Sequence, residues 1–172
     1  MLHENDLNKK ININDTDINF ENIYKKEYIP QKYIEDIKNA NVLIIPNEFF
    51  GDRKILSFPE CTSEFYHFLK NRSEIQTEIC IDDDKYEKLE LHADIIYMAT
   101  LIVQYAALPI LVNLISSFLY DKVKSMNKEV NKTNMNIHIV VEEKGKTKKI
   151  SYEGSIEYFE KSMRSVENDL FK

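Results

Sequence analysis

The side chains that could do chemistry in this chain are its clustered acids, its histidines and its cysteines. Asp82, Asp83 and Asp84 form an acidic triplet between two segments that alternate like strands. A calcium loop needs acidic ligands at alternate positions, a central glycine and a terminal glutamate, and the triplet has none of these in place. It therefore indicates a solvated turn or a helix cap.

A second acidic group, Glu142 and Glu143 followed by Lys144, stands at the end of a predicted strand. It is similar to half of a metal-dependent nuclease core, which also needs an upstream aspartate on the neighbouring strand as a further oxygen ligand. The nearest preceding acids, Asp121 and Glu129, belong to a predicted helix end and a linker. Charged hairpin ends are the commoner meaning, and a nuclease stays an alternative.

The remaining reactive residue types lack the spacing that chemistry requires. The four histidines form neither H-x-x-x-H nor H-E-x-x-H, and Cys61 and Cys80 fit no Cys-x-x-Cys or zinc spacing. Neither cysteine has a sequence-local group that would activate its thiolate. The three glycines cannot form a dinucleotide-binding or phosphate-binding loop. The sequence thus predicts no catalytic residue, no metal ligand and no cofactor.

Length and composition indicate one globular domain. The 172 residues include ten tyrosines and nine phenylalanines but only three glycines and four prolines, so we expect a real core with prominent helices. The net charge is -6: residues 1–121 carry -9, and residues 122–149 carry +5. This balance does not favour nucleic acid as a partner. Free cysteines and an N-terminus without an apolar signal segment predict a cytoplasmic protein.

The periodicity of the apolar residues predicts the elements that would position these groups. Residues 1–20 are rich in Asn and Asp and are predicted to be a polar N-terminal arm, and residues 21–172 to be one α+β domain with possible sub-units 21–92 and 93–172. The expected elements are a helix at 31–40, strands at 41–46 and 54–59 that pair as a hairpin, a helix at 62–70 and a strand at 74–81. Periodicity leaves residues 86–94 undecided.

The dominant signal is a long apolar helix. No charged residue or histidine occurs between Ile95 and Tyr120, and Pro109 should kink or split the helix there. A hairpin at 136–153 that turns at 144–147 and an amphipathic helix from Ile156 follow it. The predicted fold class is therefore α+β, with a small mixed or antiparallel sheet packed on a long, Pro-interrupted apolar helix and ending in a β-hairpin and an amphipathic helix.

The apolar helix could lie in a membrane or in a protein core. As a helix, the 26 residues from Ile95 to Tyr120 would extend about 39 Å, enough to cross a bilayer of roughly 30 Å. Pro109 and the uncharged polar residues oppose this reading. The lysines that follow the helix would also force an acidic N-terminal region across the membrane. A membrane span is therefore disfavoured, and a buried or interface helix is expected.

A helix that is apolar on nearly every side needs more cover than this short chain provides, so we expect a protein partner or a homodimer. The polar residues within it, Gln104, Asn113, Ser116 and Ser117, mark the expected interface. An alternative is a small-molecule sensor of nucleotide type, with a pocket walled by the helix and closed by Gln104 and Asn113.

The run LELHADIIYMATLIVQYAALPILVNLISSFLYDKVK, followed by IHIVVEEKGKTKKISYEGSIEYFEK, resembles small uncharacterised bacterial proteins with the same order of elements. In outline, residues 89–165 are similar to the effector-associated constant component group of bacterial conflict systems. The motif residues, Pro109, Asp121 and Gly154, are structural, and the chain departs from the group in its long linker and larger N-terminal half. The resemblance implies a non-enzymatic module that accompanies an effector in antiphage defence and acts by protein contact.

Overall fold

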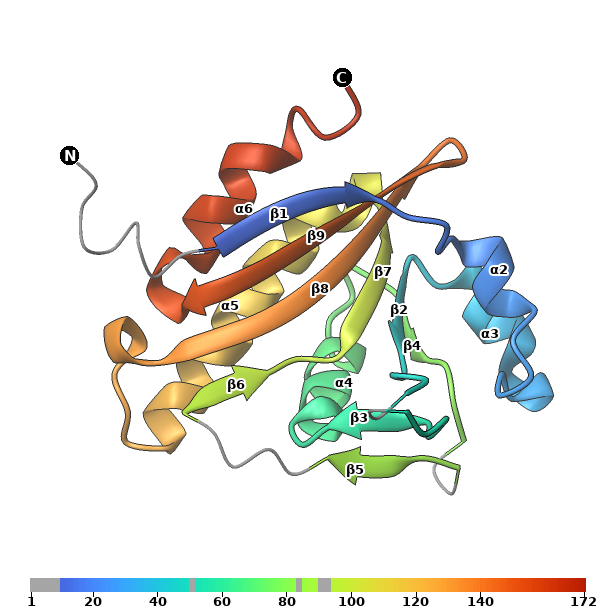
Figure 1. Ribbon diagram of the computed structural model, residues 1–172, viewed down its shortest axis with the longest axis horizontal. Helices are drawn as coiled ribbons and strands as arrows, with labels where there is room; N and C mark the ends of the chain where they lie inside the picture. Colours follow the sequence, from blue (N-terminus) through green and yellow to red (C-terminus); the bar gives the residue numbers. More distant parts are fainter. Residues whose placement is uncertain (1–9, 50–51, 83–84, 90–93) are drawn as a thin grey trace.

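A seven-stranded mixed sheet forms the centre of the computed structural model, which describes residues 10–49, 52–82, 85–89 and 94–172. The strand order is β1, β9, β8, β7, β2, β4, with β6 also paired to β8, and β3 and β5 form a separate pair (Figure 1). The strands are β1 (Lys10–Asp15), β2 (Val42–Ile45), β3 (Ser57–Pro59), β4 (Thr77–Ile79), β5 (Glu87–Leu89), β6 (Ile95–Tyr97), β7 (Thr100–Gln104), β8 (Asn134–Glu143) and β9 (Lys146–Ser155).

Helices lie on both faces of the sheet but cover them unequally. The helices are α2 (Phe20–Tyr24), α3 (Ile34–Asn39), α4 (Thr62–Lys70), α5 (Leu108–Ser125) and α6 (Phe159–Glu167), with short 3-10 helices η1 (Gln31–Tyr33), η2 (Tyr105–Ala107), η3 (Val130–Lys132) and η4 (Ile156–Tyr158). One face packs with α4, α5 and α6 into the larger core, and the opposite face packs with α2 and α3 into a smaller one. The predicted α+β class with a mixed sheet is confirmed.

The hairpin of β8 and β9 forms as the sequence alternation predicts. Ile139 pairs with Ile150 in the register, and both side chains are buried on the α5 side. Lys144 and Gly145 make the turn with φ angles of 50° and 81°, the left-handed geometry that a tight hairpin requires. Tyr152 of β9 then packs edge-on against Phe159 of α6, with ring centroids 5.5 Å apart, so the hairpin and the last helix share one core.

The prediction of an apolar helix from Ile95 to Tyr120, interrupted at Pro109, is wrong over its first part. Residues 95–104 contain β6 and β7, both parallel to β8, and α5 begins only at Leu108. A strand buried on both faces is continuously apolar, so periodicity does not separate it from a buried helix. Pro109 lies in the first turn of α5, where its missing N–H is not needed, and so it does not split the helix.

The predicted hairpin of residues 41–46 with 54–59 is also wrong as a sheet. Strand β2 pairs in parallel with β4 and antiparallel with β7, whereas β3 pairs with β5. A single bridge, Asn47 with Ser57, is what joins the two segments. All four residues of β2 are buried, because it occupies an interior position between two other strands. The helices predicted at 31–40 and 62–70 and the strand within 74–81 are confirmed.

The N-terminal segment contributes an element that its composition did not predict. Residues 10–15 form β1, which pairs antiparallel with β9 so that Ile11 lies opposite Tyr152 and Ile13 opposite Ile150. Because Tyr152 and Ile150 belong to the larger core, Ile11 and Ile13 lie on the helix side of the sheet. Asn12 and Asn14 lie on the opposite face.

Candidate functional site

The outer surface of α5 holds part of the expected interface. Nine residues of α5 are buried in the protein itself, among them Ser116, which is 5% exposed. Asn113 and Ser117 are exposed on the opposite side of the helix, and Ile110 beside them is 39% exposed. The structure therefore brings Asn113 and Ser117 together on one accessible stripe and removes Ser116 from it.

Gln104 does not belong to the same surface. It is exposed at the end of β7, where it pairs with Glu142 on β8. The neighbouring Val103 faces the larger core beneath α5, and successive strand residues point to opposite faces, so Gln104 points away from α5. The structure thus separates Gln104 from Asn113, and the two do not close a common pocket.

Residues 105–125, which include η2 and α5, form the one described helical segment with the length and hydropathy of a membrane span. Within that segment, 56% of the most apolar window is buried inside the protein. Core helices of soluble proteins meet the same criteria, so the segment is weak evidence for membrane contact.

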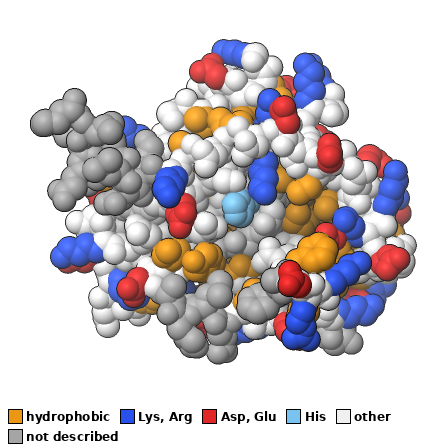
Figure 2. All heavy atoms as spheres, in the orientation of Figure 1, with side chains coloured by type: hydrophobic (Ala, Val, Ile, Leu, Met, Phe, Trp, Pro, Cys, Tyr) orange, Lys and Arg blue, Asp and Glu red, His pale blue; other side chains and the backbone are white. Residues whose placement is uncertain are grey.

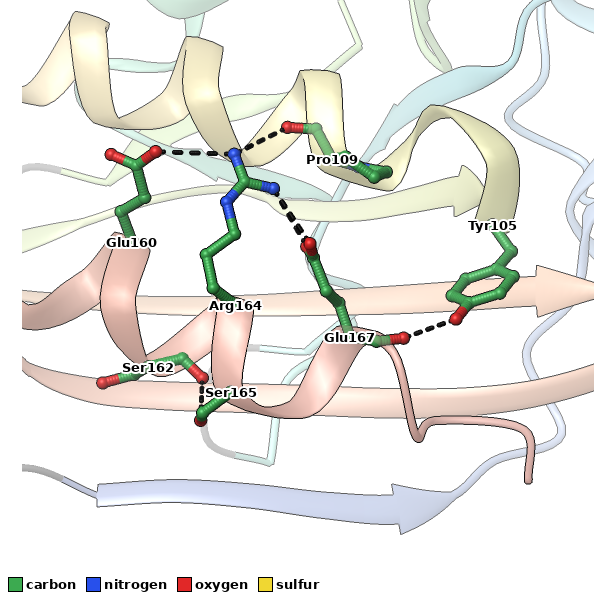
Figure 3. A network of polar contacts seen from close by, with 7 residues as sticks. All are labelled: Tyr105, Pro109, Glu160, Ser162, Arg164, Ser165 and Glu167. Atoms are coloured by element: carbon green, nitrogen blue, oxygen red, sulfur yellow. Dashed lines mark hydrogen bonds and ion pairs between the residues drawn. The ribbon is translucent and has the colours of Figure 1, made fainter.

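A polar network fastens the C-terminal helix to the start of α5 (Figure 3). Arg164 on α6 donates to both carboxylate oxygens of Glu167 at 3.1 Å and to the Pro109 carbonyl at 3.2 Å. The Tyr105 hydroxyl donates to the Glu167 carbonyl oxygen, with 2.5 Å between the oxygens. Glu167 is only 8% exposed, so this buried carboxylate is balanced by a guanidinium. The network therefore joins α6 to η2 and the start of α5.

His138 and Ser151 are residue types common in catalytic sites, and the fold brings them together. They face each other on β8 and β9, with 2.7 Å between Nδ1 and Oγ. Burial, helped by Lys149, lowers the pKa of His138, and Glu153 opposes this effect. No described carboxylate hydrogen-bonds the imidazole, so the pair lacks the group that orients the base in a catalytic triad.

The surroundings of this pair are an uncovered half of the sheet. Helices α2 and α3 pack over Leu43, Ile102 and Val140, leaving β1, β9 and the first part of β8 without a covering helix. Figure 2 shows this side of the molecule, where polar and charged side chains alternate with small hydrophobic patches. A mixed polar surface of this kind is usual for the solvated face of an antiparallel sheet.

A cavity of about 370 Å³ lies where the C-terminal end of α5 meets β6 and β3. Its lining includes Cys61, whose burial raises the pKa of the thiol to about 11, so the thiol stays protonated near neutral pH. Lys122 pairs with Glu64 at 2.8 Å on the same wall. Sequence reasoning missed this cavity, because its lining comes from several segments far apart in the chain.

A second cavity, of about 630 Å³, lies against the outer side of β4. All of its charged lining residues except Asp36 form ion pairs with described residues: Glu78 with Lys70 at 2.7 Å, and Asp82 with Lys32 at 3.8 Å and Lys85 at 3.4 Å. Of the acidic triplet, Asp82 thus forms ion pairs, and Asp83 and Asp84 lie outside the described residues.

The residues proposed for a nuclease site are not assembled. Glu142 accepts a hydrogen bond from the N–H of Phe20 at 3.2 Å, at the start of α2. Asp121 lies near the end of α5 that leads to the start of β8, whereas Glu142 lies near the other end of β8. Across the described ranges, no three His, Cys, Asp or Glu side chains lie close enough to hold a metal ion.

Strand β1 forms one end of the sheet and presents a long exposed edge. Five of its six residues are exposed, including Ile13 at 41%. Within the described part of the chain, no strand pairs with the outer side of β1. As far as the described residues show, its backbone N–H and C=O groups on that side have no strand partner and could pair with another strand.

Comparison with protein-family models, with curated proteins and with solved structures finds no match to this chain.

Proposed function

We propose that this protein is a non-enzymatic interaction module, an adaptor that accompanies an effector in a bacterial antiphage defence system. The observation that supports contact as its role is the exposed six-residue edge of β1, with Ile13 41% exposed. An exposed strand edge binds partners by adding a strand, with main-chain hydrogen bonds supplying affinity and side chains supplying specificity. The defence setting and the cytoplasmic location rest on the sequence resemblance and composition alone.

The stripe on α5 provides a second contact surface in this proposal. Most of the apolar surface of α5 is buried in the internal core, so the helix does not require a partner to cover it. What it offers a partner is Ile110, 39% exposed, with Asn113 and Ser117 beside it. An apolar anchor with polar neighbours is the usual composition of a small contact site.

Site-specific photo-crosslinking in the cells that produce the protein tests this function. A benzophenone amino acid at position 13 or 110 is expected to yield adducts of higher mass that contain a second protein. The same amino acid at position 157, where Glu157 is exposed on a different surface, is the matched control. Absence of protein adducts from both test positions, or equal adducts from position 157, would overturn the proposal.

A small-molecule sensor is the second candidate, because the 370 Å³ cavity has the size of a ligand pocket. Its lining includes Lys88, Lys122 and Lys128 beside Glu60, Glu64 and Asp94. An anionic group such as a phosphate could replace Glu64 as the partner of Lys122. A nucleotide that raises the Tm of the protein should lose that effect in Lys122→Met and keep it in Lys161→Met, whose lysine is exposed on α6. If no nucleotide in a panel raises the Tm of the unmodified protein or of Lys161→Met, this candidate is excluded.

A further inference from the structure

The two ends of the central sheet differ in how far they are protected against strand pairing. The end formed by β4 is three residues long and has charged side chains along its outer side, with Glu78 bound by Lys70 at 2.7 Å and by the Tyr66 hydroxyl at 3.2 Å. Short length and charged side chains are the means by which soluble proteins prevent edge pairing. The β4 end is therefore closed to a partner.

The end formed by β1 is less protected, because its charged residues, Lys10 and Asp15, stand only at the two ends of the strand. The strand is six residues long, has no proline, and alternates isoleucine with asparagine over most of its length. The described ion pair on it, Asp15 with Lys148 at 2.6 Å, joins β1 to its neighbour β9 and does not guard the outer side. An edge of this length is a template for another strand.

The sequence of β1 is complementary to itself. When two such strands pair antiparallel about a twofold axis perpendicular to the sheet, only residues on the same face can lie opposite each other. Centring the axis on Asn12 places Ile11 opposite Ile13 of the second copy, and Lys10 opposite Asn14. The isoleucines then meet on the helix side and the asparagines on the other side, with no like charges opposed.

A shift of the axis by one residue gives a poorer match. Centring it on Ile13 pairs Ile13 with its own copy but sets the carboxylate of Asp15 against Ile11 on the helix side. That arrangement brings a charged group next to an apolar one, whereas the Asn12 register does not. The register centred on Asn12 is therefore preferred.

We propose that two copies of this chain join through β1 in this register, which makes one sheet continuous across both copies. The inference deepens the proposed interaction function and rests on it, because it names a second copy as the partner of the β1 edge. A strand pair of this length spans about 20 Å. It buries less surface than a standard interface, which buries about 800 Å² per partner. The dimer is accordingly a weak one, with Kd on the order of 1 to 100 µM.

Disulfide trapping tests the register directly. Residues opposite each other in an antiparallel pair have Cα atoms about 4.5–5.5 Å apart, within the range that a disulfide spans. Asn12→Cys should therefore give a covalent dimer on mild oxidation. Asn14→Cys is the matched control, because it faces Lys10 instead of its own copy, and the native Cys61 and Cys80 are buried. A covalent dimer from Ile13→Cys but not from Asn12→Cys would overturn the register.

Sedimentation of the purified full chain tests the dimer itself. The sedimentation coefficient should rise with concentration, and Ile13→Lys should weaken association roughly tenfold or more by placing a charge at the centre of the edge. Ile110→Lys is the control, because Ile110 is exposed to the same degree, 39% against 41%, but lies on α5. It should leave association unchanged.

The possible outcomes separate the inference from the function on which it rests. A chain that stays monomeric up to about 0.5 mM, or one whose association is lost in Ile110→Lys instead of Ile13→Lys, overturns pairing through β1. Cross-linked partner proteins in cells would still support the interaction function in that case. Conversely, a β1 dimer without any foreign partner retains the self-pairing and removes the adaptor role.

Discussion

The two faces of the central sheet are built from the same strands but differ in how much of each is covered by helices. On one face, α4, α5 and α6 pack with both halves of the sheet into a continuous core. On the other, α2 and α3 cover only the part around Leu43, Ile102 and Val140. We therefore expect stability to be concentrated on the first face, where helices cover more of the sheet.

The burial patterns of the strands differ in the same way. Strand β2 is buried on both faces, whereas β8 alternates: Ile137 and Ile139 are buried on the helix side, and Asn136 and His138 are partly exposed on the other. Partial exposure of polar side chains keeps the second face soluble without a covering layer. We therefore expect substitutions in the helix-covered core to lower the free energy of unfolding most, and substitutions of exposed residues on the covering helices to lower it least.

The largest effect is expected for Phe159→Ala in the helix-covered core. Phe159 is fully buried and its ring packs edge-on against Tyr152, so truncation leaves a cavity between α6 and β9. We expect a loss of about 3–5 kcal/mol in the free energy of unfolding, measured by urea denaturation. Lys161→Ala on the exposed side of the same helix should stay within about 0.5 kcal/mol. A loss near 1 kcal/mol for Phe159→Ala would contradict the expectation that stability is concentrated in the helix-covered core.

A smaller effect is expected for Ile37→Ala under the opposite face. Ile37 is also fully buried, but its cluster comprises fewer residues and lies between two short helices and the sheet. We expect a loss of about 2–3 kcal/mol, at the low end of the range for such truncations, because a small cluster collapses around a cavity more easily.

Hydrogen exchange compares the local stability of the two faces in the unmodified protein. Amides of α3 should exchange by local opening, well before those of α5, because few apolar contacts hold the smaller cluster. Equal protection of the two helices would show that both faces unfold as one unit.

The sequence predicted the elements whose burial is one-sided. The hairpin of β8 and β9 and the helix α4 were recognisable, because one face of each is buried and the apolar residues keep a clear period. The run from Ile95 to Gln104 was not, because strands buried in the middle of a sheet lose that period. Strand β1 was missed because its isoleucines alternate with asparagines, which are depleted in strands in general.

The surfaces were less predictable than the elements. Asn113 and Ser117 lie on one face of α5, which their spacing of four residues fixes whatever the tertiary fold, whereas Ser116, predicted with them, is buried. Gln104 was grouped with them only because the helix was extended too far, and its position depends on the turn from β7 to α5. The Cys61 cavity needs the packing of β3, β6 and α5, which no local pattern encodes.

A pH-dependent effect is expected on the uncovered half of the second face. Burial lowers the pKa of His138 below its ordinary value of 6.5, so below that pH the unfolded chain binds a proton that the folded chain resists. Stability should therefore fall as pH is lowered through about 6.5. His138→Gln should flatten this decline in urea midpoints measured from pH 5 to 8, and a decline unchanged by the substitution would exclude His138 as its source.

The smallest effects compare the two sides of α5 itself. Asn113→Ala and Ser117→Ala change exposed residues and should alter the free energy of unfolding by no more than about 0.5 kcal/mol. Ser116→Ala lies one residue from Ser117 but is buried, and its hydroxyl has no hydrogen-bond partner among the described residues. Removing an unpaired buried hydroxyl ends its desolvation cost, and alanine favours the helix, so we expect stabilisation by about 0.5–1 kcal/mol.

Thermal denaturation of Ser116→Ala and Ser117→Ala under identical conditions provides the measurement. A higher Tm for Ser116→Ala with no change for Ser117→Ala would fit a helix whose inner side is committed to the core and whose outer side is free for contact. A lower Tm for Ser116→Ala would mean that the hydroxyl is satisfied in solution, by water or by another chain. If that loss grew with protein concentration, the buried side of α5 would belong to an interface after all, and the division between the two faces would have to be redrawn.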